Sequence, residues 1–303
     1  MMELPMLENT PSPPPVPQGG CDTHMHVFEH APQYPMVADR VYTPGTASWS
    51  EYQAICKKFG ISRTILVQPS VYGTDNSLHL HHLQRYHETT RMVVVCSLEQ
   101  LEKHADDWHH KGVRGVRINL ATSQDRHANE EENIRLITML NGLGWHAQIF
   151  ANTKDILTFA DQTEASHTAI VADHFAGFRP DLPMQQDDWD RIICLLQTER
   201  LFIKLTSRIP TVPHDQLEAF LKRFQELCQR FPRQMLWGSD WPHTNSLQRG
   251  KNPTQAHQQA HQQEGFRDVD WMLEWKRLWA LCGFDKTIWQ LVLRDNPASL
   301  YDF

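Results

Sequence analysis

The sequence lacks the features that mark several large classes of protein. It contains no CxxC pair and no short repeated cysteine spacing, so neither a disulfide framework nor a zinc ribbon is expected. It has no run of about 18 apolar residues, and no basic stretch followed by an apolar segment near its first residue. We therefore expect a soluble, unexported, cytoplasmic protein with reduced thiols. The six cysteines are Cys21, Cys56, Cys96, Cys194, Cys228 and Cys282.

Basic residues are fewer than acidic ones. The 29 lysines and arginines face 36 aspartates and glutamates, so the formal net charge is −7 and the pI is near 6.2. This balance argues against nucleic acid or an anionic membrane as the main partner. The chain also has no GxGxxG turn, no GxxxxGK(S/T) loop and no GxSxG elbow. Dinucleotide, phosphoryl-transfer and serine-hydrolase chemistry therefore lack their usual anchors.

Short β-rich runs alternate with helical periodicity along most of the chain. Eight such runs predict one closed (β/α)8 TIM barrel of class α/β, with an open doubly wound sheet as the weaker alternative. Before them, the proline-rich stretch 11–17 favours an extended chain. We assign residues 1–19 to an N-terminal arm and residues 20–303 to the barrel. The expected strands are 21–27, 64–68, 92–97, 115–119, 146–150, 169–173, 202–205 and 235–238. The expected helices include 49–59, 77–87, 130–141, 187–197, 214–230, 271–281 and 286–293.

Residues 245–268 are polar, rich in glutamine and histidine, and follow the last expected strand. In a barrel this position lies on the face that carries active sites. Two interpretations stay open: an ordered lid over the site, or a mobile surface insertion of biased composition.

Side chains capable of catalysis gather at the expected ends of three strands. Asp22, His24 and His26 alternate along the first strand, so we expect all three to face the barrel. Asp240 follows the last strand, which neighbours the first when a barrel closes. His174 follows the sixth strand at the same level; taken alone, it would be read as a satisfied core histidine. Together these segments predict one active site.

The sequence resembles the amidohydrolase superfamily of the amidohydrolase 2 type, in particular its 2-pyrone-4,6-dicarboxylate hydrolase-like lactonases. The resemblance extends from residue 20 to the end of the chain, with the matching segments in the same order. It implies a (β/α)8 barrel hydrolase that acts on a carboxylic ester bond. The matching segments are 22–28 (DTHMHVF), 67–70 (VQPS), 73–76 (GTDN), 112–119 (GVRGVRIN), 144–146 (GWH), 173–174 (DH), 237–243 (WGSDWPH), 296–297 (NP) and 300–301 (LY).

The resemblance implies a catalytic role for four residues. Asp240 would act as general base on water that attacks a lactone carbonyl, while His24, His26 and His174 would position and polarise the reacting groups. These roles are chemically sound. A carboxylate can accept the proton of water, and donors aimed at the carbonyl oxygen stabilise the charge that develops there.

Substrate-binding residues are expected around this centre. Arg117 and Arg208 follow the fourth and seventh strands, where guanidinium groups can grip a substrate carboxylate through two hydrogen bonds. Tyr42 and Ser70 match positions that help to bind the pyrone dicarboxylate in the family. His243, in the segment that holds the general base, completes the predicted binding set.

The chain departs from the family pattern at two places that bear on the substrate. Where a second basic residue is expected after the fourth strand, residues 121–123 read Ala-Thr-Ser, and Arg126 lies further along. Phe150 replaces a tyrosine at the end of the fifth strand, which removes a hydroxyl donor. Arg114 is left off the site, because a structural ion pair explains it nearly as well.

We expect that no metal is required. His24, His26 and Asp240 could hold one divalent ion such as zinc, and this set is the fallback interpretation. However, no lysine lies within the fourth-strand motif to form the bridging carbamate of the two-metal members. The resemblance also implies a metal-independent lactonase.

The leading hypothesis is therefore hydrolysis of a small carboxylated lactone, such as a pyrone dicarboxylate, a muconolactone or a sugar-acid lactone. The alternatives are a lactone isomerase or a metal-dependent decarboxylase of the same superfamily, and a catalytically silent barrel that binds an acidic metabolite. Neither nucleic acid nor a membrane is expected as a partner. The sequence does not determine the natural lactone, the pathway or the oligomeric state.

Overall fold

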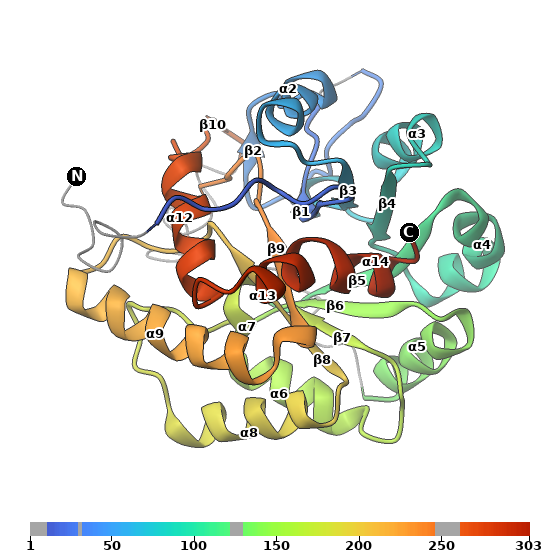
Figure 1. The fold of residues 1–303 in the computed structure, drawn as a ribbon. Helices are drawn as coiled ribbons and strands as arrows, with labels where there is room; N and C mark the ends of the chain where they lie inside the picture. The colour runs from blue at the N-terminus through green and yellow to red at the C-terminus, as the bar shows by residue number, and fades with distance from the viewer. Residues whose placement is uncertain (1–10, 30–31, 122–129, 246–260) are drawn as a thin grey trace.

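The computed structural model describes residues 11–29, 32–121, 130–245 and 261–303, and within them eight strands form one parallel sheet. The strands lie side by side in chain order, and the helices surround them (Figure 1). The strands are β1 (Cys21–Met25), β3 (Arg63–Val67), β4 (Thr90–Val94), β5 (Val113–Asn119), β6 (His146–Phe150), β7 (Ile170–Ala172), β8 (Leu201–Thr206) and β9 (Met235–Gly238).

The sheet closes where β1 meets β9. A parallel bridge joins Met25 to Trp241 just beyond the two strand ends. The backbone N–H of Asp240 donates to the carbonyl of His24 at 2.8 Å, and that of His26 donates to the carbonyl of Trp241 at 2.9 Å. The prediction of a closed (β/α)8 barrel is thereby confirmed.

Local capping signals define many of the surrounding helices. At the start of α2, Ser48 and Glu51 form a reciprocal capping box, and Gly60 ends the helix with a φ of 76°. Expected and observed bounds agree at β6, β9, α2, α9 and α12, whereas the first strand ends at Met25, earlier than expected. The helices are α2 (Trp49–Phe59), α3 (Ser77–Arg85), α4 (Leu98–Lys111), α5 (Glu130–Leu143), α6 (Thr153–Gln162), α7 (Asp173–Ala176), α8 (Gln186–Gln197), α9 (His214–Arg230), α12 (Trp271–Leu281), α13 (Lys286–Gln290) and α14 (Asn296–Tyr301), with a π-helical turn at Leu291–Asp295.

Apolar side chains fill the barrel interior near the end at which β1 begins. Side chains from five strands pack on one another and on Tyr301 of α14, which covers this end. A larger cluster fills the space between the strands and the helices. The interior cluster consists of Cys21, Ile65, Val67, Val93, Val171, Leu236 and Tyr301.

A bulge in β1 changes the direction of Asp22 from the one expected from the sequence. The register between β1 and β3 shifts after Asp22, which breaks the strict alternation of side chains. Asp22 therefore accepts hydrogen bonds from the hydroxyl of Tyr52 in α2 and from the backbone N–H of Ser239, both at 2.8 Å. The expectation that Asp22 lines the barrel beside His24 and His26 is wrong. It instead ties β1 to α2 and to the end of β9.

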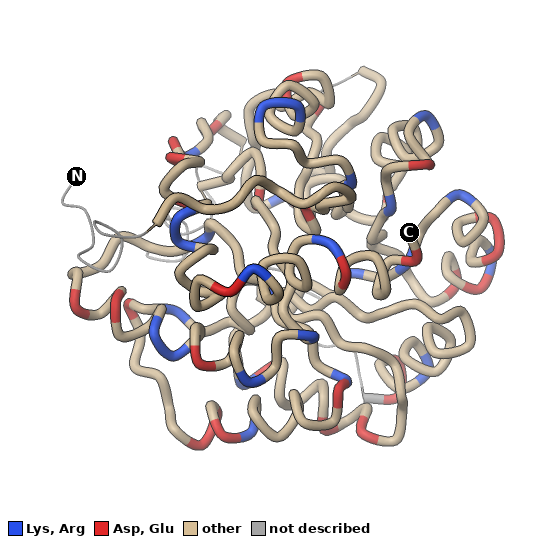
Figure 2. Tube along the Cα trace, viewed as in Figure 1, with Lys and Arg blue, Asp and Glu red and all other residues tan. Residues whose placement is uncertain are grey.

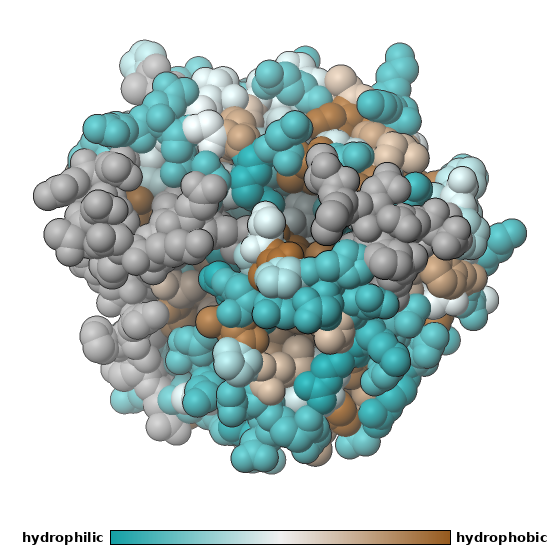
Figure 3. Space-filling model, turned by 90° about the vertical axis from the view of Figure 1, so that its left-hand side faces the viewer, coloured by the Kyte–Doolittle hydropathy of each residue, from teal (hydrophilic) through white to brown (hydrophobic). Residues whose placement is uncertain are grey.

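The outer surface carries charges of both signs without a single dominant patch. Acidic and basic residues are interspersed on outer helices such as α4, α8 and α9 (Figure 2). On the face drawn in Figure 3, the coloured residues are mostly hydrophilic and the hydrophobic ones form small separate patches. Within the described ranges, no helix combines the length and the apolar character that crossing a membrane demands.

Two peripheral segments singled out in the sequence lie partly outside the described residues. Of the predicted arm, residues 1–10 are not described; residues 11–17 form neither helix nor strand, and the carbonyl of Pro15 accepts from the indole N–H of Trp289 at 3.2 Å. Of the segment 245–268, residues 246–260 are not described. Its later part forms β10 (Gln263–Glu264), which pairs with β2 (Thr43–Pro44).

Candidate active site

A pocket with about 410 Å³ of empty space, open to solvent, lies at the carboxyl ends of the strands. Its wall is mostly polar and combines one carboxylate with two guanidinium groups and two imidazoles. Seven of the nine residues predicted for the site line it, so residues far apart in the sequence do converge. The lining residues are His26, Tyr42, Ser70, Arg117, Asn119, Phe150, His174, Arg208, Asp240 and Thr244.

Gly238 allows β9 to approach His24 closely enough to complete the site. A Cβ atom at this position would lie 2.5 Å from the Cβ of His24, which is shorter than side chains tolerate. With glycine there, the Oδ1 atom of Asp240 lies 3.8 Å from Nε2 of His24 and 4.0 Å from Nε2 of His174. His24 is fully buried and lies directly behind the pocket wall.

Two of the candidate catalytic residues have left-handed backbone conformations. Asp240 has a φ of 59° and His174 a φ of 48°, and the left-handed turn at His174 continues to Gly177. Each such position costs a non-glycine residue on the order of 1–3 kcal/mol, and this cost is typically found at functional sites. Here the sharp turns aim both side chains back over the ends of their strands.

Hydrogen bonds define which ring nitrogen of His24 and His26 faces the pocket. Nδ1 of His26 lies 2.7 Å from the carbonyl oxygen of Val67, and must donate because a carbonyl only accepts. Nδ1 of His24 lies 3.2 Å from Oδ1 of Asp173 and 3.5 Å from Nζ of Lys204, and the shorter contact with the carboxylate favours the ring proton on Nδ1. Both histidines therefore present an unprotonated Nε2, which is a hydrogen-bond acceptor.

His174 has the opposite arrangement. Its Nδ1 lies 2.9 Å from Oγ1 of Thr206, and this hydroxyl oxygen accepts from the backbone N–H of Arg208 at 3.4 Å. When the hydroxyl of Thr206 donates to Nδ1, the ring proton of His174 resides on Nε2. His174 is then a donor, in contrast to the Nε2 atoms of the other two site histidines.

Burial controls the charge of Asp240. Removal from water raises the pKa of this carboxyl from 3.8 to about 6, and the nearby Arg267, Arg208 and Arg117 limit the rise. A carboxylate with a pKa near 6 is ionised at neutral pH, yet it is more basic than an exposed aspartate. This is the property that general-base catalysis requires.

Burial also keeps the site histidines neutral. It lowers the pKa of His24 to about 4, against the opposing effect of Asp173. It lowers the pKa of His26 and of His174 well below the usual value, and neighbouring positive groups act in the same direction. At neutral pH all three rings are available as neutral donors or acceptors.

Beneath the pocket, Asp173 is the centre of a polar network that the sequence analysis did not assign to the site. Its Oδ2 accepts from Arg117 at 3.3 Å and from the amide of Gln148 at 3.2 Å, and its Oδ1 lies 3.7 Å from Nζ of Lys204. Burial acts to raise the pKa of Asp173, but His24, Lys204 and Arg117 together hold it well below its usual range. The sequence feature that could have revealed this network is the presence of a glutamine in β6 and a lysine in β8, two strands that are otherwise largely apolar.

The two arginines that are predicted to bind the substrate carboxylate both pack against the ring of Phe150. The guanidinium carbons of Arg117 and Arg208 lie 5.3 and 4.8 Å from the centre of its ring. A third arginine, Arg267, was not singled out because it belongs to the segment 245–268. Its Nη2 lies 3.7 Å from Oδ2 of Asp240.

His243 is the one predicted site residue that neither lines the pocket nor touches the other site histidines. Its ring packs on Trp271, with the ring centres 5.7 Å apart, and its Nδ1 lies 3.2 Å from Oγ of Ser207. This position supports the pocket wall from behind.

Arg114 pairs with Asp302 at 3.0 Å, away from the pocket. Residue 126, the displaced arginine of the sequence analysis, lies outside the described residues.

The geometry permits a cation at one predicted group. His24, His26 and Asp240, here called the acceptor group, offer ligand atoms that all lie within 4.8 Å of one another. Nε2 of His24 and Oδ2 of Asp240 are buried without a hydrogen-bond partner, so the donor set fits a divalent ion. A second set replaces His26 and Asp240 by Asp173 and His174. It is less suitable, because Oδ2 of Asp173 already accepts two hydrogen bonds and the ammonium group of Lys204 lies 3.7 Å from Oδ1.

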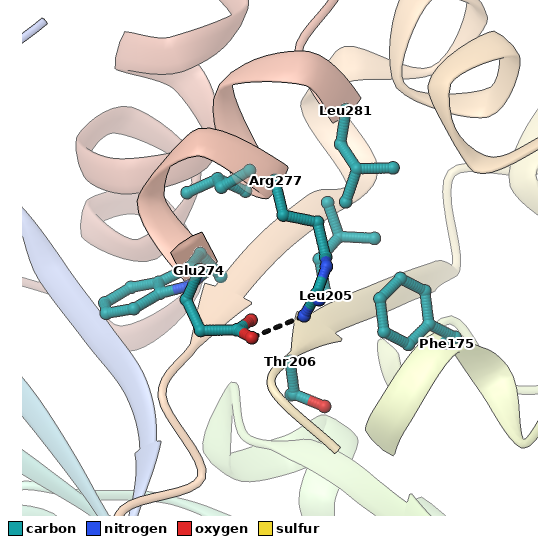
Figure 4. Close-up of a pocket in the computed structure, with 8 residues that line it drawn as sticks. Phe175, Leu205, Thr206, Glu274, Arg277 and Leu281 are labelled. Carbon is teal, nitrogen blue, oxygen red and sulfur yellow. Dashed lines mark hydrogen bonds and ion pairs between the residues drawn. The ribbon is translucent and has the colours of Figure 1, made fainter. Parts of the chain in front are cut away.

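A second hollow, with about 200 Å³ of empty space, lies beside α12 and β8 (Figure 4). Apolar side chains dominate its wall, and Glu274 and Arg277 form an ion pair within it. Thr206 lies on this wall and also contacts His174, so the hollow lies behind the catalytic centre. Its one carboxylate, that of Glu274, is engaged by Arg277.

A parallel eight-stranded barrel with histidines and an aspartate at the carboxyl ends of its strands defines a hydrolase scaffold of the amidohydrolase class. The chain belongs to the amidohydrolase family, whose model matches residues 21–303.

Two curated relatives and one solved structure are similar to this chain. A 4-sulfomuconolactone hydrolase of Rhizobium radiobacter is 27% identical over 294 residues, covering 94% of this chain and 91% of the relative. A 2-pyrone-4,6-dicarboxylate hydrolase of Comamonas testosteroni is 28% identical over 246 residues, covering 76% and 79%. The crystal structure of a probable 2-pyrone-4,6-dicarboxylic acid hydrolase from Acinetobacter baumannii, with citric acid bound, matches with a TM-score of 0.75 and 22% identity. It covers 94% of this chain and 100% of that chain, and this likeness supports the fold.

Proposed function

We propose that this protein is a hydrolase that opens a small carboxylated lactone with water activated by Asp240. The observation that carries the proposal is the placement of a carboxylate of raised pKa within 4.0 Å of the Nε2 atoms of His24 and His174, in a pocket that also contains two arginines. The names of the two relatives, a sulfomuconolactone hydrolase and a pyrone dicarboxylate hydrolase, support the same reaction class.

In the proposed reaction, the hydrogen-bond acceptors bind the attacking water, and the donor His174 binds the oxygen of the lactone carbonyl. Asp240 accepts one proton of water, and the unprotonated Nε2 of His24 or His26 accepts a hydrogen bond from the other. The water oxygen bonds to the lactone carbonyl carbon, and the Nε2–H of His174 stabilises the oxyanion that forms. The ring C–O bond then breaks, and the proton held by Asp240 passes to the leaving oxygen.

Binding of the substrate carboxylate is assigned to Arg117 and Arg208, stacked on Phe150. The hydroxyls of Tyr42 and Ser70 belong to the same wall and supply orienting hydrogen bonds. Arg117 is also bound to Asp173, so its position is fixed, whereas Arg208 follows the end of β8. His243 acts indirectly in this scheme, by supporting the wall.

We further propose that the reaction requires no metal. The acceptor group would hold a divalent ion if one were bound, and that ion would polarise the carbonyl and lower the pKa of water. Three guanidinium groups already place positive charge around Asp240, and a neutral donor already faces the carbonyl. The protein's own side chains therefore supply each element of the reaction.

The test is a turnover assay of purified protein against a panel of carboxylated lactones, before and after exhaustive chelation. Ring opening is followed by proton release, and the product is identified as an open-chain acid or a rearranged lactone. We expect proton release that chelation does not change and that Asp240→Asn abolishes. A rearranged lactone would indicate an isomerase, and loss of turnover on chelation with recovery on zinc would overturn metal independence. Lack of turnover on every lactone would contradict the proposed function.

A further inference from the structure

Lys204 is a fully buried lysine at the base of the candidate site. Its Nζ donates to the carbonyl of Thr23 at 2.8 Å and to Oε1 of Gln148 at 2.7 Å. It also lies 3.5 Å from Nδ1 of His24 and 3.7 Å from Oδ1 of Asp173. Every neighbour of this ammonium group is therefore a residue that contacts, or adjoins, a member of the candidate site.

A structural role alone is a weak explanation for this charge. Taking an ammonium group out of water costs several kcal/mol, and well-packed apolar residues often replace buried ion pairs without loss of stability. The barrel interior next to it is indeed apolar. A buried charge that contacts the members of a candidate site is itself a candidate member of that site.

We propose that Lys204 is a positioning residue that serves as a fixed internal cation and disfavours a divalent ion at the acceptor group. This inference rests on the proposed metal-independent reaction. Lys204 lies 3.5 Å from His24, which belongs to the acceptor group, and both side chains are fully buried, so water screens the repulsion between Lys204 and a divalent ion only weakly. Lys204 and Arg117 also neutralise Asp173, which would otherwise strengthen the attraction of a cation.

The charge is present under ordinary conditions. Burial lowers the pKa of Lys204 to about 8, and Asp173 opposes that change. The two hydrogen bonds that Nζ donates and its 3.7 Å distance from the carboxylate of Asp173 fit the ammonium form, and the titrations are carried out at pH 7.0.

The experiment compares zinc binding by calorimetry and by metal analysis after dialysis. The proteins are the wild type, Lys204→Met and the control Lys111→Met. Lys111 is partly exposed on α4 and pairs with Asp107, so its replacement makes the same change in net charge far from the barrel interior. We expect Lys204→Met to bind one zinc ion at least tenfold more tightly than the wild type does. The Lys111→Met control should match the wild type.

A double variant locates the new zinc site. Asp240→Asn removes one ligand of the acceptor group, so Lys204→Met/Asp240→Asn should lose the gain in affinity. Equal zinc affinity in the wild type and Lys204→Met would overturn the proposal, as would tight zinc binding by the wild type that Asp240→Asn abolishes. If circular dichroism shows that Lys204→Met does not fold, Lys204→Gln is used with the same criteria.

Zinc binding needs no lactone. A chain that proves inactive on every lactone would therefore refute the proposed function, while the zinc titrations still decide the role of Lys204.

Discussion

The Nε2 atom of His24 lies 3.8 Å from the Oδ1 atom of Asp240, and with the ring proton of His24 on Nδ1, beside Asp173, both atoms are acceptors. Two acceptors at this distance do not bond to each other. They are suited to a shared donor, either the two protons of one water molecule or a cation. Whether this pair of atoms binds water or a metal ion therefore distinguishes a metal-free from a metal-dependent reaction.

Replacement of Asp240 by asparagine should stabilise the protein while abolishing turnover. The folded-state pKa of about 6 exceeds the usual 3.8, so the protonated form favours folding. That stabilisation is full below about pH 3.8 and is lost as pH rises through about 6. At pH 8 the wild type bears the full cost of a buried carboxylate, and asparagine removes it. We expect the free energy of unfolding in urea at pH 8 to rise by about 1–3 kcal/mol.

The matched control for this experiment is Asp106→Asn on the exposed face of α4. It should change stability by less than about 0.5 kcal/mol and leave activity intact. A loss of stability in Asp240→Asn would show that the carboxylate has a strong ionic partner in the folded state.

The pH dependence of kcat/KM should follow Asp240. Because the base must be ionised, we expect activity to rise with pH through a single ionisation near pH 6. His24, with a pKa of about 4, is neutral near pH 6 and should add no second ionisation to the profile there. Initial rates between pH 4.5 and 8 on one lactone measure the profile. A midpoint near 4, or a decline between pH 6 and 7, would assign the base to another group.

Alanine at Gly238 should damage both stability and activity. The added Cβ would lie 2.5 Å from the Cβ of His24, so one of two backbone segments must move. Overpacking of this kind typically costs about 1–3 kcal/mol. Gly142→Ala in α5 is the control, because nothing lies within 4 Å of its added Cβ, and alanine favours a helix. Urea denaturation of both variants should therefore show opposite signs.

Valine at Thr206 should reduce kcat more than it raises KM. In the proposed reaction the hydroxyl donates to Nδ1 of His174 and so directs the ring proton to Nε2, and valine has nearly the same shape without that donor. We expect kcat to fall by about 10- to 100-fold, less than the roughly 100- to 1000-fold loss that follows when an oxyanion donor is removed outright. Steady-state kinetics measure the change, with Thr158→Val on the exposed side of α6 as control. Unchanged kcat would remove His174 from the proposed reaction.

Methionine at Arg208 should weaken the binding of carboxylated lactones specifically. We expect KM to rise by about tenfold or more, because one charge-assisted pair is lost. The KM for an uncharged lactone should change little. Arg191→Met, which removes an exposed arginine paired with Asp161, serves as the control. An equal effect on charged and uncharged lactones would assign Arg208 to folding of the pocket wall.

By itself, the sequence determined the barrel and the main members of the site. Eight alternating strand and helix patterns predict a (β/α)8 fold, because each short buried run requires a covering helix. Strand ends at β1, β7 and β9 then predict that His24, His174 and Asp240 converge, since parallel strands of a barrel end on one face.

Only the tertiary structure decided how these groups can act. A bulge in β1 turns Asp22 toward α2, an outcome that period-two alternation cannot predict. Lys204 and Arg267 enter the site from positions that look like a strand interior and a surface segment. Protonation likewise depends on partners distant in the chain: Thr206 contacts Nδ1 of His174, and burial raises the pKa of Asp240. The physical reason is that side-chain direction and loss of water arise from packing, which no local pattern of residues encodes.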